Sequence, residues 1–341
     1  MLCTPRVHSW RASYGMQVTH VKWLKASRFD VVIYKVGRCA VSVSLGGRQP
    51  LSSSATNLGY HNRNTPGGVA VPHEIAKAMT LQDIQDTIDD HVHAAKCAIE
   101  AGFDCVEIVS SNNTLLKPEF DGMQASGNGY LLDQFLNSNT NLRTDNYGGN
   151  KENRARFTLE ILDAVIAAIG ASRVALRTSP WGTVWLPLDP DPIAIWRYLL
   201  SEIEKRGIAY VCLTQPRADL LLEEKTKIDN IFTAIKEGKV AATVEDLHLR
   251  HFEEVLKTTP VLANGNYDSE NCFDEVEKSE VDAIVFGRYF ISNPDLVEKL
   301  RLGKKLTKWN NATVYITSIA NEIEGYTDYP FGEVEEEITV V

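Results

Sequence analysis

The chain has 341 residues, of which 44% are hydrophobic and 23% charged, and its formal net charge is -10. This acidic balance argues against binding to nucleic acid or to an anionic membrane surface, because both attract basic proteins. The six cysteines occur singly, without the spacing of a zinc site, and no run of about 18 apolar residues is present. We therefore expect a soluble cytoplasmic protein with reduced thiols and no metal site.

Short β-branched runs alternate along the chain with amphipathic helical segments. Thr80 is a candidate N-cap for the first long helix, and Asn293 and Pro294 are placed to begin the last one. The predicted strands are 30–37, 103–109, 173–179, 208–214, 260–265 and 282–287. The clearest helices are 80–102, 153–170 and 191–207. Strand–helix units with apolar strands indicate a parallel sheet covered by helices.

Glycine and polar clusters follow several of the predicted strands. The richest is 127–157, which reads GNGYLLDQFLNSNTNLRTDNYGGNKENRARF. In a (β/α) barrel the functional site lies on the loops that follow the strands. The pattern therefore predicts one α/β domain over residues 1–341, with the architecture of a TIM-type (β/α) barrel.

Several of these motifs resemble those of one known family. They are GFDCVEIV, the segment 127–157, RVALRTSPW, VLANGNY and FGRYFISNPDL…GYTDYPF. Together they resemble the Old Yellow Enzyme family of FMN-dependent ene-reductases, which are built on a TIM barrel. The match is weak near Val21 and strong from about Thr80 to Phe331. The end of the chain resembles fungal members, some of which act in secondary-metabolite pathways.

The resemblance implies a catalytic pair. In the family, reduced flavin passes hydride to an activated alkene while two side chains hydrogen-bond the substrate carbonyl, and a tyrosine protonates the α-carbon. Asn128 matches the second carbonyl donor and Tyr130 the acid. The first donor has no match, because Ala125 stands three residues before Asn128, or Val109 if the strand end is aligned instead. The alternative is that Asn128 and Tyr130 are ordinary loop residues.

The resemblance also implies a flavin site in two parts. Gly265, Asn266, Gly287 and Arg288 match the family's phosphate cradle, which uses backbone N–H groups and an arginine. Arg177 matches the arginine beside the flavin ring. The alternatives are a barrel-closing turn for the glycines and surface ion pairs for the arginines.

The contacts expected on the ring side are fewer. The family's first strand, with its APMTR-like ring contacts, has no counterpart, and Val32 aligns with the glutamine expected on the third strand. We therefore expect an incomplete barrel with about six recognisable strands and the first two missing. Residues 1–30 form an atypical N-terminal segment, in which a helix-like stretch at 16–27 can cover a sheet edge but not replace strands. A homodimer is another way to cover the exposed edges.

Two loops bear on the substrate. The polar segment 110–126 is an insertion relative to the family pattern, and it is either a substrate-shaping loop or drift. The loop 46–68 can form part of the pocket mouth, where His61 is either a spare donor or a plain surface residue.

Three functions follow from this pattern. The first is an ene-reductase that uses FMN and NADPH to reduce the C=C bond of a small enone, enal or quinone-like metabolite, with NADPH versus NADH left open. The second is a flavin-free isomerase or cyclase that orients a reactive intermediate in the same pocket. The third is an inactive remnant of the family. We expect the first.

Overall fold

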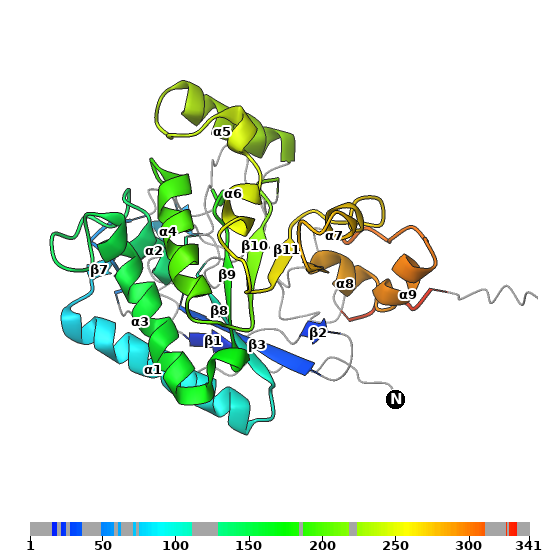
Figure 1. The fold of residues 1–341 in the computed structure, drawn as a ribbon, viewed down its shortest axis with the longest axis horizontal. Coiled ribbons are helices and arrows are strands. Elements are labelled where there is room, and N and C mark those ends of the chain that lie inside the picture. The colour runs from blue at the N-terminus through cyan, green and yellow to red at the C-terminus, as the bar shows by residue number, and fades with distance from the viewer. Residues whose placement is uncertain are drawn as a thin grey trace, which may run out of the picture.

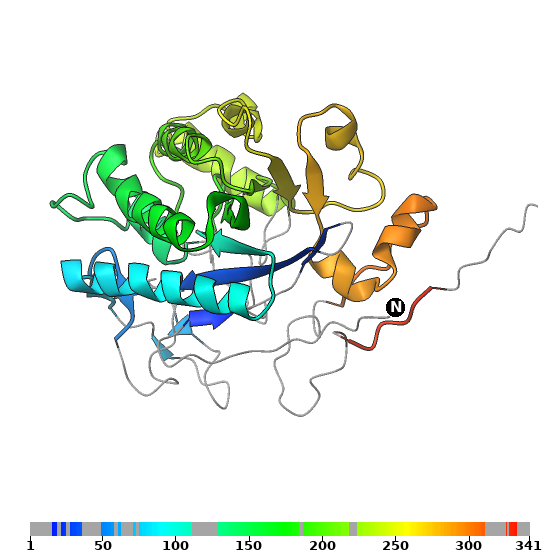
Figure 2. The ribbon, with the colours of Figure 1, turned by 60° about the horizontal axis from the view of Figure 1, so that its bottom comes forward.

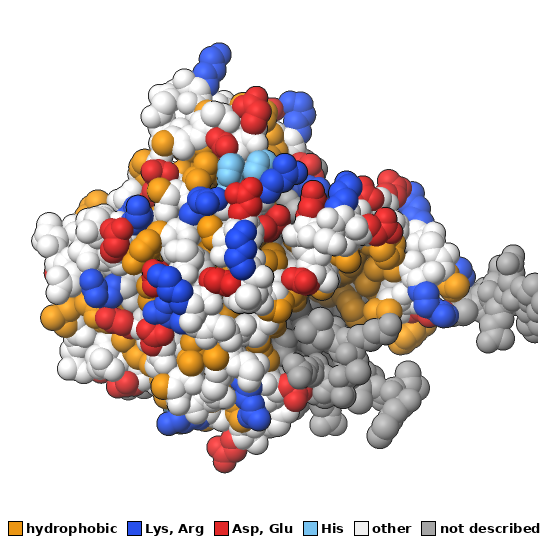
Figure 3. Space-filling model, in the orientation of Figure 1, with side chains coloured by type: hydrophobic (Ala, Val, Ile, Leu, Met, Phe, Trp, Pro, Cys, Tyr) orange, Lys and Arg blue, Asp and Glu red, His pale blue; other side chains and the backbone are white. Residues whose placement is uncertain are grey.

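The computed structural model describes residues 16–18, 22–24, 28–35, 49–57, 61–62, 71–72, 75–110, 129–183, 187–217, 224–310, 325 and 327–332. These residues form one large sheet with helices packed against it (Figure 1). None of the helices in these ranges is long and apolar enough to cross a membrane. On the face shown in Figure 3, acidic and basic side chains are interspersed rather than gathered by sign.

Six parallel strands form most of the large sheet and pair in chain order. They are β3 (Arg28–Lys35), β8 (Cys105–Val109), β9 (Val174–Thr178), β10 (Tyr210–Thr214), β11 (Val261–Asn264) and β12 (Ala283–Val285). The predicted parallel sheet of six strands is confirmed. Among the described residues no pairing joins β12 back to β3, so this TIM-type barrel is not closed.

The free side of β3 is covered by two short antiparallel strands. β1 (Met16–Val18) and β2 (Lys22–Leu24) both pair with β3, and the register shifts by one residue between the two pairings, as a bulge produces. The helix predicted across 16–27 is therefore wrong over these strands. An unpaired edge offers a row of backbone hydrogen bonds, which outweighs a weak helical pattern in a short segment.

Three long helices lie side by side along one face of the sheet (Figures 1 and 2). They are α1 (Leu81–Glu100), α3 (Lys151–Ile169) and α4 (Pro192–Glu204). The predicted cap of α1 is confirmed, because Asp83 N donates to Thr80 Oγ1 at 3.1 Å and Thr80 N donates to Asp83 Oδ2 at 2.8 Å. Asp191 caps α4, and Pro192 fills its first turn.

Further helices and two small strand pairs complete the described structure. The remaining helices are α2 (Leu131–Leu136), α5 (Glu224–Lys236), α6 (Arg250–Glu253), α7 (Asp274–Glu277), α8 (Arg288–Ser292) and α9 (Leu296–Arg301), with 3-10 turns at Ala171–Arg173 and Val244–Asp246. Two small strand pairs join β4 (Leu51–Ser52) to β7 (Lys77–Ala78) and β5 (His61–Asn62) to β6 (Val71–Pro72).

The predicted start of the last helix is wrong by two residues. α9 begins at Leu296 with Asp295 before it, and Asn293 follows the end of α8 instead. The Asn293 side chain is buried and accepts hydrogen bonds from Thr307 N at 2.8 Å and Lys299 Nζ at 2.9 Å. It therefore ties the chain after α9 back to α8, a long-range role that a local capping pattern does not reveal.

The large sheet presents different side chains on its two faces. Residues such as Val106, Leu176 and Val211 belong to the main apolar core under the helices. Alternate residues, including Tyr210 and Cys212, form a second cluster on the opposite, inner face. Every residue of β8, β9 and β10 is buried, whereas all three residues of β12 are only half-buried.

Candidate active site

Arg177 lies near the carboxyl end of β9, on the inner face of the sheet. Its Nε donates to Glu107 Oε1 at 2.7 Å, and both side chains are buried, with Glu107 1% and Arg177 5% exposed. Burial lowers the pKa of Arg177, but the neighbouring Cys212 and Glu107 raise it more, so the pKa lies above its ordinary value. Arg177 is therefore charged and part of a buried pair, and the alternative of a surface ion pair is wrong for it.

The guanidinium of Arg177 is only partly satisfied by its neighbours. Its Nη2 lies 2.7 Å from Glu107 Oε1 without the alignment of a hydrogen bond, and this buried nitrogen has no hydrogen-bond partner. Asn264 donates to Thr214 Oγ1 at 2.8 Å in the amide orientation that satisfies both of its ends, and its Oδ1 then accepts from Arg177 Nη1 at 3.1 Å. A buried cationic donor thus remains at the edge of the sheet where the parallel strands end.

The residues predicted for a phosphate cradle come together where β11 and β12 end. Gly265 has φ +113°, which favours glycine, and Asn266 has φ +52°. Arg288 Nη2 donates to Asn266 Oδ1 at 3.2 Å, joining two segments 22 residues apart. Gly287 precedes α8, and the space where a side chain would stand on it is open within 4 Å. The four residues that the motifs suggested therefore lie on two adjacent turns.

Arg288 is held in place from a second side. Its guanidinium carbon lies 4.3 Å from the centre of the Trp309 ring, within the range of a cation–π contact. The Trp309 ring in turn meets Tyr289 edge-on, with ring centres 4.8 Å apart. The arginine is thus oriented by Asn266 and by an aromatic ring together.

Arg217 is a residue of this region that sequence reasoning missed. Its Nε donates to Gly265 O at 3.3 Å, and its own carbonyl accepts from Asn266 Nδ2 at 3.0 Å. Its guanidinium lies 4.7 Å from the centre of the Tyr267 ring, and its buried Nη2 has no hydrogen-bond partner. The signal for it was its place three residues after the end of β10, at the edge where the cradle forms.

The predicted catalytic residues are only partly described. Tyr130 is buried and stands directly before α2. Asn128 lies outside the described residues, as do Ala125 and all of the insertion beyond Ser110. Val109 ends β8 opposite Arg177 and is 1% exposed. An apolar side chain therefore stands at one of the two positions where the first carbonyl donor was sought.

Two other predicted positions are described only in their backbone. Val32 pairs with Glu107 in the sheet, and His61 belongs to the short strand β5. The roles considered for these two side chains stay predictions.

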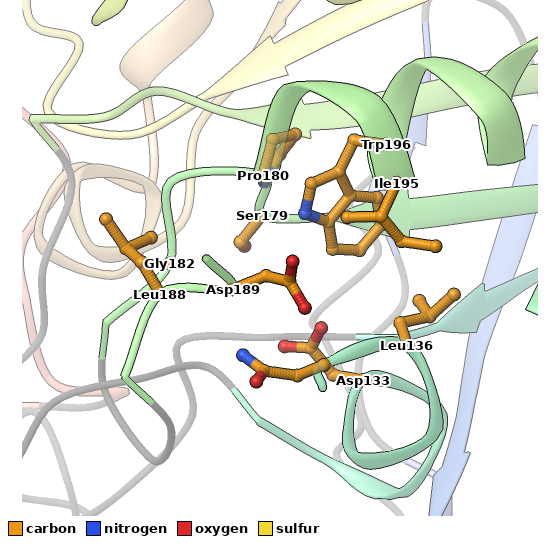
Figure 4. A pocket seen from close by; sticks show the side chains of 10 residues that line it. Asp133, Leu136, Ser179, Pro180, Gly182, Leu188, Asp189, Ile195 and Trp196 are labelled. Atoms are coloured by element: carbon orange, nitrogen blue, oxygen red, sulfur yellow. The ribbon is translucent and has the colours of Figure 1, made fainter. Parts of the chain in front are cut away.

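A small polar pocket lies between α2, the end of β9 and the start of α4. The carboxyl groups of Asp133 and Asp189 point toward one another in it (Figure 4). Asp189 is paired with Arg154, whose Nη1 lies 2.5 Å from its Oδ2. The buried Ser179 Oγ, also at this pocket, has no hydrogen-bond partner. Burial, together with the charge of Asp189, raises the pKa of Asp133 to about 8.

The charges around the end of the sheet fit a flavin mononucleotide. A phosphate needs cationic and backbone donors, which Arg288 and the turns at Gly265 and Gly287 supply. One buried nitrogen each of Arg177 and Arg217 makes no hydrogen bond, although Glu107 Oε1 lies 2.7 Å from Arg177 Nη2 and Glu275 Oε1 lies 3.9 Å from Arg217 Nη2. Fold and site thus fit a flavin-dependent oxidoreductase of the TIM-barrel type.

Comparison with known proteins identifies the family. The model of the NADH:flavin oxidoreductase / NADH oxidase family matches residues 31–307. Flavin oxidoreductase hxnT of Emericella nidulans is 36% identical over 334 residues, covering 96% of this chain and 78% of that protein. 12-oxophytodienoate reductase 1 of Oryza sativa is 32% identical over 316 residues, with 92% and 72% covered.

A solved structure supports the same assignment. Morphinone reductase in complex with tetrahydroNAD superposes with a TM-score of 0.67 at 30% identity, covering 92% of this chain and 75% of that one. The chain belongs to the NADH:flavin oxidoreductase family, that of the Old Yellow Enzyme and its homologues. It is an FMN-dependent oxidoreductase that takes its electrons from a nicotinamide.

Proposed function

We propose that this protein is an ene-reductase that reduces the activated C=C bond of a small enone or enal in secondary metabolism, with NADPH as reductant. The observation that carries the proposal is the hydrogen bond of 3.2 Å between Arg288 and Asn266, which assembles the cradle from two distant segments. The names of the relatives support the substrate class, since one is a 12-oxophytodienoate reductase and another a morphinone reductase.

Each residue of the site has a definite task in this proposal. When bound, FMN supplies the hydride. Gly265, Gly287 and Arg288 hold its phosphate, and Arg177 places a positive charge beside its ring. The Tyr130 hydroxyl donates its proton to the α-carbon of the substrate, and Asn128 donates a hydrogen bond to the carbonyl oxygen, where negative charge develops.

The apolar side chain of Val109 favours a second candidate. A carbonyl held by one donor instead of two is less activated, which restricts reduction to strongly electrophilic substrates such as quinone-like metabolites. The second candidate is a flavin-free isomerase or cyclase. The apolar side chain of Val109 suits it, because such an enzyme needs orientation of the substrate more than stabilisation of charge.

Location and assembly belong to the proposal as well. We place the protein in the cytoplasm, in keeping with the singly spaced cysteines of its sequence. We also propose a homodimer that covers the edge of the sheet beyond β12, a strand that pairs only with β11 among the described residues and whose three residues are half-buried. Sedimentation of the purified protein tests this, and a monomer at all concentrations would contradict it.

The visible absorbance spectrum of the purified protein, before and after addition of FMN and desalting, tests the function. We expect flavin bands in near-stoichiometric amount, bleached by NADPH without oxygen and restored by a simple enone such as 2-cyclohexenone. Repeating the bleaching with NADH compares the two nicotinamides. A colourless, folded protein that retains no added FMN would exclude the ene-reductase and favour the isomerase or cyclase.

A further inference from the structure

Glu107 is the buried acidic partner of the arginine proposed to lie beside the flavin. It stands in the middle of β8 on the inner face, two residues before Val109. Its Oε1 accepts from Arg177 Nε at 2.7 Å, and its Oε2 accepts from the hydroxyl of Tyr210 on β10 at 3.0 Å. Three neighbouring strands thus contribute one side chain each to a single hydrogen-bonded group.

The contacts fix both the position and the charge of this carboxylate. With 1% of its surface exposed, Glu107 is poorly screened by solvent, so its charge acts at full strength on its neighbours. Its charge raises the pKa of Arg177, and hydrogen bonds to both of its oxygens hold the group in one orientation. The orientation of the Arg177 guanidinium is therefore fixed, and the negative charge of Glu107 partly cancels its positive charge.

We propose that Glu107 is a positioning residue that sets the reducing power of the bound FMN by offsetting the charge of Arg177. A reduced flavin carries more negative charge than an oxidised one, so an uncompensated arginine would stabilise the reduced state and weaken it as a hydride donor. Glu107 prevents this while keeping the guanidinium aligned. This inference rests on the proposed function, since it needs FMN beside Arg177.

The experiment compares two variants of the full-length protein loaded with FMN. Glu107→Gln keeps the shape and removes the charge, whereas Tyr210→Phe removes one hydrogen bond to the same carboxylate and keeps the charge. We expect Glu107→Gln to bind reduced FMN about tenfold more tightly relative to oxidised FMN, which raises the midpoint potential by about 30 mV for two electrons. Tyr210→Phe should shift the potential by a small fraction of this.

A pair of variants guards against misfolding, because Glu107→Gln leaves a buried arginine without its partner. Arg177→Gln alone is expected to lower the potential, and adding Glu107→Gln should return it toward the wild-type value. A potential that the loss of Glu107 changes in neither background would overturn the inference, leaving Glu107 a packing residue whose loss affects only thermal stability. A wild-type protein that binds no FMN would instead overturn the proposed function, and the inference with it.

Discussion

The two ends of the large sheet differ in how many of the residues proposed for the flavin site they bring together. At the β11–β12 end, Gly265, Asn266 and Arg288 are brought together by hydrogen bonds and by the stacking of Trp309. At the other end, β3 is bordered by the antiparallel strands β1 and β2, where a TIM barrel continues with parallel strands. One end brings together the residues proposed to hold the phosphate, and the other is bordered by antiparallel strands.

This difference shows that the parts of one site depend to different degrees on residues far away in the sequence. The cradle needs only two turns that each follow a strand, so short motifs are enough to specify it. Contacts to the flavin ring come from several strands around a barrel, and altering one edge changes many of them together. The phosphate end can therefore persist while the ring end diverges.

Replacement of Tyr130 by phenylalanine is expected to have the largest effect. It tests whether Tyr130 is the proton donor in the reduction of the substrate. Loss of the proton donor should slow reoxidation of the reduced flavin by an enone about 10²- to 10⁴-fold, with reduction by NADPH unchanged. Stopped-flow measurement of the two half-reactions checks this. Tyr198→Phe on α4 is the matched control, and an equal slowing of both half-reactions would rule out the role of Tyr130.

Removal of Arg288 tests the phosphate end directly. Arg288→Ala deletes a charge-assisted contact, which is worth about 1.5–3 kcal/mol, so FMN should bind roughly 10- to 150-fold more weakly. Titration of the apoprotein, followed by flavin fluorescence, measures the change. Arg301→Ala on the exposed surface of α9 should leave the affinity as it is. Unchanged affinity in Arg288→Ala would mean that the cradle is only a relic of the fold.

The sequence predicted features that depend on neighbouring residues, and it did not predict those that depend on contacts between distant segments. The six strands and the Thr80 cap each depend on a few neighbouring positions, and both features are present in the structure. The residues predicted for a phosphate cradle lie on two adjacent turns, and their role stays a prediction. The pairing of Glu107 with Arg177 joins strands 70 residues apart, so no pattern in one segment indicates it. The strands at 16–24 are stabilised by an edge that only the folded sheet provides.

The pocket lined by Asp133 and Asp189 gives a test that depends on pH. The pKa of Asp133 rises from 3.8 to about 8 on folding, so between these values the native state holds a proton that the unfolded state releases. Stability should therefore fall as pH rises toward 8, by about 1.4 kcal/mol per pH unit near the middle of that range.

Asp133→Asn should remove this dependence. Urea unfolding of the wild type and the variant at pH 5, 6, 7 and 8 measures it, and the variant should gain most relative to the wild type at pH 8. Asp163→Asn, which changes a largely exposed carboxylate, serves as the control. Parallel stability curves for the wild type and Asp133→Asn would show that Asp133 is ionised in the native state.

The smallest effect expected concerns the ring that supports the cradle. Trp309→Leu removes the face over which Arg288 lies, a contact worth about 0.5–1 kcal/mol at a partly exposed site, so FMN should bind roughly two- to fivefold more weakly. Trp309→Phe keeps an aromatic face and should lose less. Because Asn266 also holds the guanidinium, an affinity unchanged in both variants would mean that this hydrogen bond alone orients Arg288. The proposed phosphate site would then depend only on its two turns, whereas contacts to the flavin ring depend on several strands.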